Sequence, residues 1–178
     1  MKRIVVLSCV MLLASAIPAL AQKALAEALA RSADGSLRNL VESAEKMPEA
    51  DYGFQATKET RTFGGFVGHT VNSAFNNCSR AKGEANPNKE DLEKVTVKAK
   101  LVEAAKAVQA YCNAVFAAQT DASLAEMITL GQQQAPRGQA LIGVISHNMN
   151  EYGQMVILLR LKGQVPPSTE RATRKPGI

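Results

Sequence analysis

Several residue types are scarce in this chain of 178 residues. It contains no tryptophan, and aromatic residues make up only 4% of it. No run alternates cleanly between apolar and polar side chains, so no segment is predicted to form a β-strand. Together with the abundance of alanine, these absences favour helices packed on helices.

Sequence motifs of several common chemistries are also missing. There is no C-x-x-C, which excludes a zinc ribbon and a haem attachment site. No G-x-S-x-G elbow and no phosphate-cradling glycine loop are present. Lysine and arginine form no run with interleaved aromatics, so a nucleic-acid partner is not expected. The short basic stretch Arg171–Lys175 is predicted to be a solvated tail.

The N-terminus has the pattern of a secretory signal peptide. Lys2 and Arg3 precede the apolar run Ile4–Ile17, and an Ala-Leu-Ala cleavage motif follows at residues 19–21. We predict that residues 1–21 are removed. An uncleaved membrane anchor is the alternative, but the run is short for a span of ~20 residues.

The remaining residues, 22–178, are predicted to form one domain. Loss of the two basic residues of the signal lowers the formal charge from +5 to +3. The predicted location is the periplasm or the exterior, without stable membrane insertion after cleavage. Cys78 and Cys112 are then the two remaining cysteines. They either form one disulfide in an oxidising compartment or are two separate buried thiols.

Helical periodicity predicts an all-α four-helix bundle. An Ala/Leu-rich stretch, Gln22–Arg31, precedes the first helix as a separate helical turn or a loose leader. Long connections are expected after helices one and three, the second of them running from Thr120 to Arg137 and lacking regular structure. The four helices are predicted at Ser36–Met47, Thr62–Lys82, Asn88–Phe116 and Gly138–Lys162.

A histidine and a glutamate lie one turn apart on the predicted fourth helix. His147 and Glu151 are four residues apart, so they share a face near the edge of the apolar arc. A carboxylate directed toward a core costs free energy unless it is paired or bound to metal. The other histidine, His69, is at a similar edge of the second helix. If the three converge, they provide two imidazoles and one carboxylate for a metal ion.

A simpler interpretation of this spacing is also open. An i, i+4 His–Glu pair is often a surface ion pair, and a histidine beside an apolar stripe is often a hydrogen-bonded boundary residue. For a metal site, polar side chains that could orient the histidines are available at Asn72, Ser73 and Asn76, one turn from His69, and at Asn148 and Gln154 on the fourth helix.

Several blocks of the mature chain resemble the DinB-like (DinB/YfiT-like) superfamily, in particular its exported members. These blocks are Met47–Phe54, Phe63–His69, Cys78–Glu84, His147–Gln154 and Leu159–Ser168. The resemblance implies a four-helix bundle. It also implies a metal site of three histidines, one from the second helix and two from the last at i and i+4. His69 and His147 match two of these positions, whereas the third is Glu151.

The resemblance therefore implies an exported divalent-metal-dependent enzyme with His69, His147 and Glu151 as ligands. The ion would be zinc, nickel, manganese or iron, and the substrate an unidentified small molecule. Related proteins suggest a hydrolase or a thiol S-transferase, and a homodimer is expected. The alternative is a non-catalytic helical bundle, with a binding or structural role, that has lost the family's metal site.

Overall fold

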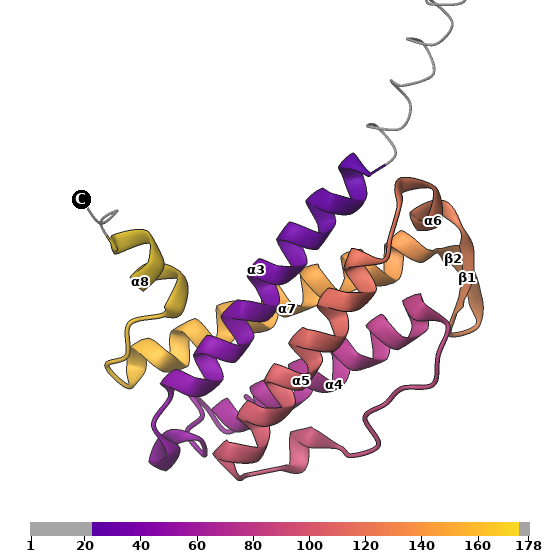
Figure 1. The fold of residues 1–178 in the computed structure, drawn as a ribbon. Coiled ribbons are helices and arrows are strands. Elements are labelled where there is room, and N and C mark those ends of the chain that lie inside the picture. Colours follow the sequence, from indigo (N-terminus) through magenta and orange to yellow (C-terminus); the bar gives the residue numbers. More distant parts are fainter. Residues whose placement is uncertain (1–22, 175–178) are drawn as a thin grey trace, which may run out of the picture.

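The computed structural model describes residues 23–174, so the predicted signal peptide lies outside the described residues. Four long helices form a bundle: α3 (Ala24–Lys46), α4 (Phe63–Lys82), α5 (Lys98–Ala117) and α7 (Arg137–Leu161). Both α3 and α4 pack against α5 and α7 (Figure 1). The predicted four-helix bundle is confirmed, as are the long connections after its first and third helices.

Contacts at the helix ends establish the directions of the helices. The Asp121 carboxylate, just beyond α5, accepts a hydrogen bond from Ala26 N at the start of α3 (2.8 Å). At the other end, Lys98 Nζ at the start of α5 donates to the Met47 carbonyl just beyond α3 (2.8 Å). Helices α3 and α5 are therefore antiparallel. A further connection, residues 83–97, runs back along the bundle between α4 and α5 (Figure 1).

The first helix is longer than predicted. Instead of a separate turn before Ser36, α3 runs without interruption from Ala24 to Lys46. Small and apolar residues continue at helical spacing through its first half, where Ala26 and Ala33 are buried. Burial of this face outweighs the helix-weakening effect of Gly35 in the middle of the helix.

The third helix begins later than predicted, at Lys98 and not at Asn88. Asn88 and Asp91 accept hydrogen bonds through their side chains from Glu90 N (3.2 Å) and Glu93 N (3.3 Å). Such local bonds compete with helix formation. The segment instead forms the short 3₁₀ helix η2 (Leu92–Lys94), which buries Leu92 against α4.

The connection between α5 and α7 is more regular than predicted. It contains α6 (Asp121–Ala125) and an antiparallel pair, β1 (Met127–Leu130) and β2 (Gln133–Pro136). Gly131 adopts a positive φ of 64° in the turn of this hairpin. The expectation that the chain has no strand is therefore wrong for this segment.

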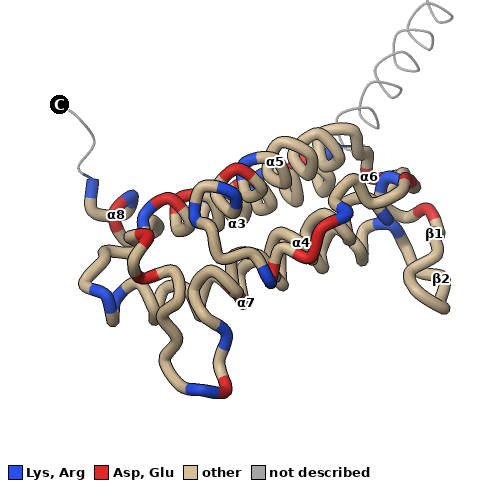
Figure 2. The backbone as a smooth tube through the Cα atoms, turned by 90° about the horizontal axis from the view of Figure 1, so that it is seen from below, with Lys and Arg blue, Asp and Glu red and all other residues tan. Residues whose placement is uncertain are grey.

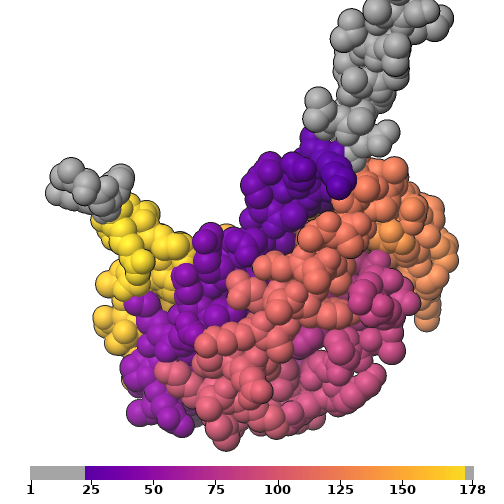
Figure 3. Space-filling view, viewed as in Figure 1, coloured from indigo at the N-terminus to yellow at the C-terminus, as the bar shows by residue number. Residues whose placement is uncertain are grey.

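The basic C-terminal stretch is not a solvated tail where the structure describes it. The connection between α3 and α4 contains the short 3₁₀ helix η1 (Glu49–Asp51). Lys162, at the end of α7, pairs with Asp51 of η1 (2.7 Å). The chain then forms α8 (Pro167–Thr173), in which Arg171 pairs with Glu42 of α3. Figure 3 shows α8 in yellow against the indigo C-terminal part of α3.

A disulfide joins Cys78 of α4 to Cys112 of α5, with their Cα atoms 5.6 Å apart. Both residues are fully buried in the core between the helices. The alternative of two separate thiols is thereby excluded in this structure. Within residues 23–174, no helix has the length and apolarity needed to cross a membrane.

Candidate metal centre

Helix α4 places His69 at the boundary of the core. Thr62 caps the helix by accepting a hydrogen bond from Gly65 N (3.0 Å), as predicted. Gly83 ends it in the left-handed conformation, with φ of 77°. Between these ends, Phe66 and Thr70 are buried, and the side chain of His69 is 27% exposed. The imidazole therefore contacts both the bundle and solvent.

Helix α7 supplies the other two side chains. His147 is half-buried and Glu151, one turn later, is only 7% exposed. Glu151 is the sole acidic residue of α7, and Figure 2 shows that charged residues are sparse along this helix. Because the carboxylate is buried, the pair is not the surface ion pair that its spacing alone allowed.

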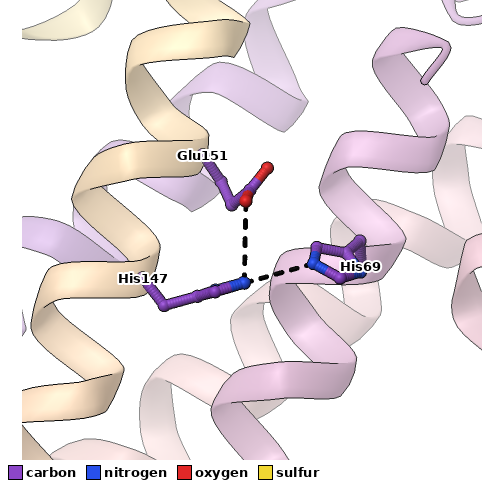
Figure 4. Close-up of side chains that lie close together, drawn as sticks. All are labelled: His69, His147 and Glu151. Atoms are coloured by element: carbon purple, nitrogen blue, oxygen red, sulfur yellow. Dashed lines mark hydrogen bonds and ion pairs between the residues drawn. The ribbon is translucent and has the colours of Figure 1, made fainter. Parts of the chain in front are cut away.

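The three predicted side chains converge. Nε2 of His69 lies 3.1 Å from Nε2 of His147, and the latter atom lies 3.6 Å from Oε1 of Glu151. One ligand atom from each residue fits within 4.8 Å of the others. Figure 4 shows the three side chains pointing toward one another from α4 and α7.

Two of these separations match those expected around a common divalent ion. Metal–ligand distances of about 2.0–2.1 Å in tetrahedral geometry place neighbouring ligand atoms about 3.3 Å apart. The two distances centred on His147 Nε2, 3.1 and 3.6 Å, lie on either side of that value. Two imidazoles and one carboxylate also match the donor sets of catalytic zinc and non-haem iron.

Electrostatics favour the metal-binding form of His147. Burial lowers its pKa below the usual value; the attraction of Glu151 opposes this effect, while His69 and Arg61 add to it. The imidazole is therefore neutral at neutral pH. A neutral imidazole nitrogen is the form that ligates metal.

Sequence reasoning missed the hydrogen-bond partner of His69. Nδ1 of this histidine lies 3.0 Å from Oε2 of Glu93 in η2, whereas Asn72 bonds to Asp91. Burial alone would raise the pKa of Glu93, but hydrogen bonds from Arg61 and His69 outweigh it and lower the pKa. The contact spans 24 residues, and no local spacing signals it.

The partners expected on α7 also differ from those predicted. Asn148 is buried, but its amide has no hydrogen-bond partner among residues 23–174. Gln154 is exposed. Neither side chain orients His147, whose Nε2 contacts His69 and Glu151. Its buried Nδ1 has no hydrogen-bond partner among residues 23–174.

The sequence matches the model of the DinB superfamily over residues 32–155. The chain belongs to the DinB superfamily. Two crystal structures of DinB-like proteins have the same fold. One, from Bacillus cereus ATCC 10987, has a TM-score of 0.64 at 17% identity, covering 74% of this chain and 89% of that one. The other, YjoA from Bacillus subtilis, has a TM-score of 0.63 at 18% identity, covering 77% and 93%.

No curated protein matches the chain. At 17% and 18% identity, the two DinB-like structures establish only the fold. The chemistry of the site has to be inferred from the residues of this chain. For this member of the superfamily, the residues that could hold a metal ion are His69, His147 and Glu151.

Proposed function

We propose that this DinB-superfamily protein is a divalent-metal-dependent enzyme in which His69, His147 and Glu151 bind the ion. The observation that carries the proposal is the convergence of two imidazole nitrogens and a buried carboxylate oxygen from α4 and α7. The ion is zinc, nickel, manganese or iron, the metals that suit this donor set. A metal held in this way keeps an open position and lowers the pKa of a bound water or thiol.

The residues of the chain would contribute binding and access. Glu151 supplies the negative charge that offsets part of the charge of a divalent cation. The side chains of His69 and His147 are 27% and 28% exposed, so a small molecule can approach from solvent. We propose hydrolysis as the reaction class, with thiol S-transfer as the second choice.

We prefer hydrolysis because the protein is predicted to be exported, and a thiol cofactor of the cytoplasm would not be available outside the cytoplasm. The Cys78–Cys112 disulfide supports an oxidising location, the periplasm or the exterior. The predicted cleavage after residue 21 and the predicted homodimer stay predictions.

Metal binding can be tested by thermal unfolding of the chelator-treated protein with and without each of the four metals. At a free metal concentration 100 times Kd, we expect stabilisation of about 2.7 kcal/mol, or roughly 5–10 °C in Tm. H69A and H147A should lose this response, because each removes one ligand. Q154A, an exposed change on α7, is the matched control and should keep it.

The alternative function is a non-catalytic helical bundle with a binding or structural role. It is favoured by Glu151, which occupies a position where the resemblance implies histidine. In that case, no metal shifts the Tm of the unmodified protein, and E151H restores metal binding. A metal-dependent rise in Tm that disappears in H69A would contradict this alternative.

A further inference from the structure

His69 has a second contact on the side of its ring away from the metal centre. While Nε2 faces His147 at 3.1 Å, Nδ1 lies 3.0 Å from Oε2 of Glu93. The other oxygen of Glu93, Oε1, accepts a hydrogen bond from Nε of Arg61 (2.7 Å). The carboxylate therefore bridges a guanidinium and the imidazole.

The backbone that carries Glu93 is fixed against α4 on one side of His69. A Cβ at Gly68 would lie 2.1 Å from the carbonyl oxygen of Leu92, so only glycine allows this close approach. The side chain of Leu92 is 3% exposed and packs into the core. These contacts hold η2 directly beside the residue that precedes His69.

A second set of contacts holds the same segment one turn beyond His69. Asn72 accepts a hydrogen bond from Leu92 N (3.3 Å) through Oδ1 and donates to Asp91 Oδ1 (3.1 Å) through Nδ2. Its Oδ1 also accepts from Asn88 Nδ2 (2.9 Å). With α4 holding η2 at Gly68 and at Asn72, the position of Glu93 relative to His69 is determined by the fold.

This arrangement has a chemical consequence for His69. An ionised carboxylate only accepts hydrogen bonds, so Nδ1 of His69 must be the donor. In the neutral imidazole, Nε2 then carries no proton, and its lone pair points toward His147 and Glu151. A carboxylate behind a metal-binding histidine commonly selects the tautomer and orients the ring in this way.

We propose that Glu93 is a positioning residue that fixes the Nδ1–H tautomer and the ring orientation of His69, and that Arg61 holds the Glu93 carboxylate in place. As a statement about metal binding, this inference rests on the proposed function. The tautomer itself can be measured without metal, so the two proposals can fail separately.

The first measurement is long-range proton–nitrogen NMR of the histidine rings in the metal-free protein at pH 8. The unmodified protein should show His69 in the Nδ1–H form, and E93A should lose this preference. E90A is the matched control, because Glu90 precedes η2 but pairs with Lys100 (2.6 Å) and contacts neither histidine. An unchanged tautomer in E93A would overturn the inference.

The second measurement is zinc affinity by competition with a chromophoric chelator. E93A should bind zinc about 10–100-fold more weakly than the unmodified protein, as is usual when such a partner is removed. E93Q keeps an acceptor oxygen and should recover part of the loss, while E90A should bind normally. If E93A does not fold, E93L, whose side chain is of similar size but accepts no hydrogen bond, decides in its place: affinity equal to that of the unmodified protein, with an unchanged tautomer, overturns the inference.

The NMR and zinc-affinity measurements distinguish failure of the inference about Glu93 from failure of the proposed metal-binding function. An unmodified protein that binds no zinc, nickel, manganese or iron contradicts the proposed function. The NMR result then still supports or overturns the role of Glu93 in orienting His69, because it requires no metal.

Discussion

At the scale of single residues, Glu151 combines a negative charge with nearly complete burial. Its closest polar neighbours are Asn150 Nδ2 at 3.4 Å and His147 Nε2 at 3.6 Å, both long for strong hydrogen bonds. A carboxylate removed from water with such partners lowers the stability of the metal-free protein. The same charge favours binding of a divalent cation.

We therefore predict opposite effects of E151Q in the two states of the protein. Without metal, E151Q should leave the free energy of unfolding unchanged or raise it by up to about 1 kcal/mol, because a buried charge is removed. With metal, E151Q should lose most of the metal-dependent rise in Tm, because a neutral amide is a poor ligand. Calorimetry of both proteins, chelated and metal-loaded, measures this crossover. A lower Tm for E151Q in both states would contradict it.

The sequence contained enough information to predict the three converging residues but not Glu93. His147 and Glu151 are related by one helical turn, and that relation follows from helix geometry alone. His69 lies at a similar edge of the helix predicted at Thr62–Lys82, and the family resemblance implied that this helix supplies a ligand. Glu93 lies in a segment predicted to be helix, and its contact with His69 depends on how η2 packs on α4.

At the scale of secondary-structure elements, the interior of each helix was easier to predict than its ends. The apolar stripes identified α4 and α7 because burial dominates there. The start of α5 was misplaced because Asn88 and Asp91 bond to nearby backbone amides, and these bonds are individually small. The β1–β2 hairpin was missed because its strands are short and mostly exposed.

The close contact between α4 and η2 at Gly68 predicts that a larger residue there destabilises the protein. G68A should lower the free energy of unfolding by about 2 kcal/mol or more, because its Cβ would collide with the Leu92 carbonyl. It should also weaken zinc binding, since η2 carries Glu93. Urea unfolding and the zinc competition measure the two effects.

Gly153 of α7 provides the matched control. A Cβ there meets no atom within 4 Å, so G153A should be neutral or stabilising by about 0.5–1 kcal/mol. If G68A were as stable as G153A, the close approach of η2 to α4 would not determine the position of Glu93.

At the scale of the whole molecule, the disulfide links two of the four long helices. Cys78 and Cys112 are 34 residues apart, and closing a loop of this length stabilises a fold by about 3–4 kcal/mol in the chain-entropy model. We predict that C78A/C112A lowers Tm by roughly 10 °C. Phosphine reduction should lower the Tm of the unmodified protein similarly and leave that of the double variant unchanged.

Metal binding by the reduced protein distinguishes the two roles of α4. The helix carries both Cys78 and His69, but the disulfide faces α5 and the imidazole faces α7. A reduced protein that still folds should therefore retain its metal-dependent rise in Tm. Loss of that rise on reduction would show that the disulfide also maintains the geometry of the metal centre.

The spacing of these residues along the chain implies an order of assembly. Cys78 needs only the next helix to find its partner, whereas His69 must wait for His147, 78 residues further along. Because the chain emerges with its N-terminus first, the Cys78–Cys112 disulfide can form before α7 has been made. The three converging side chains can come together only after α7 has been made, so the metal centre requires nearly the whole described chain.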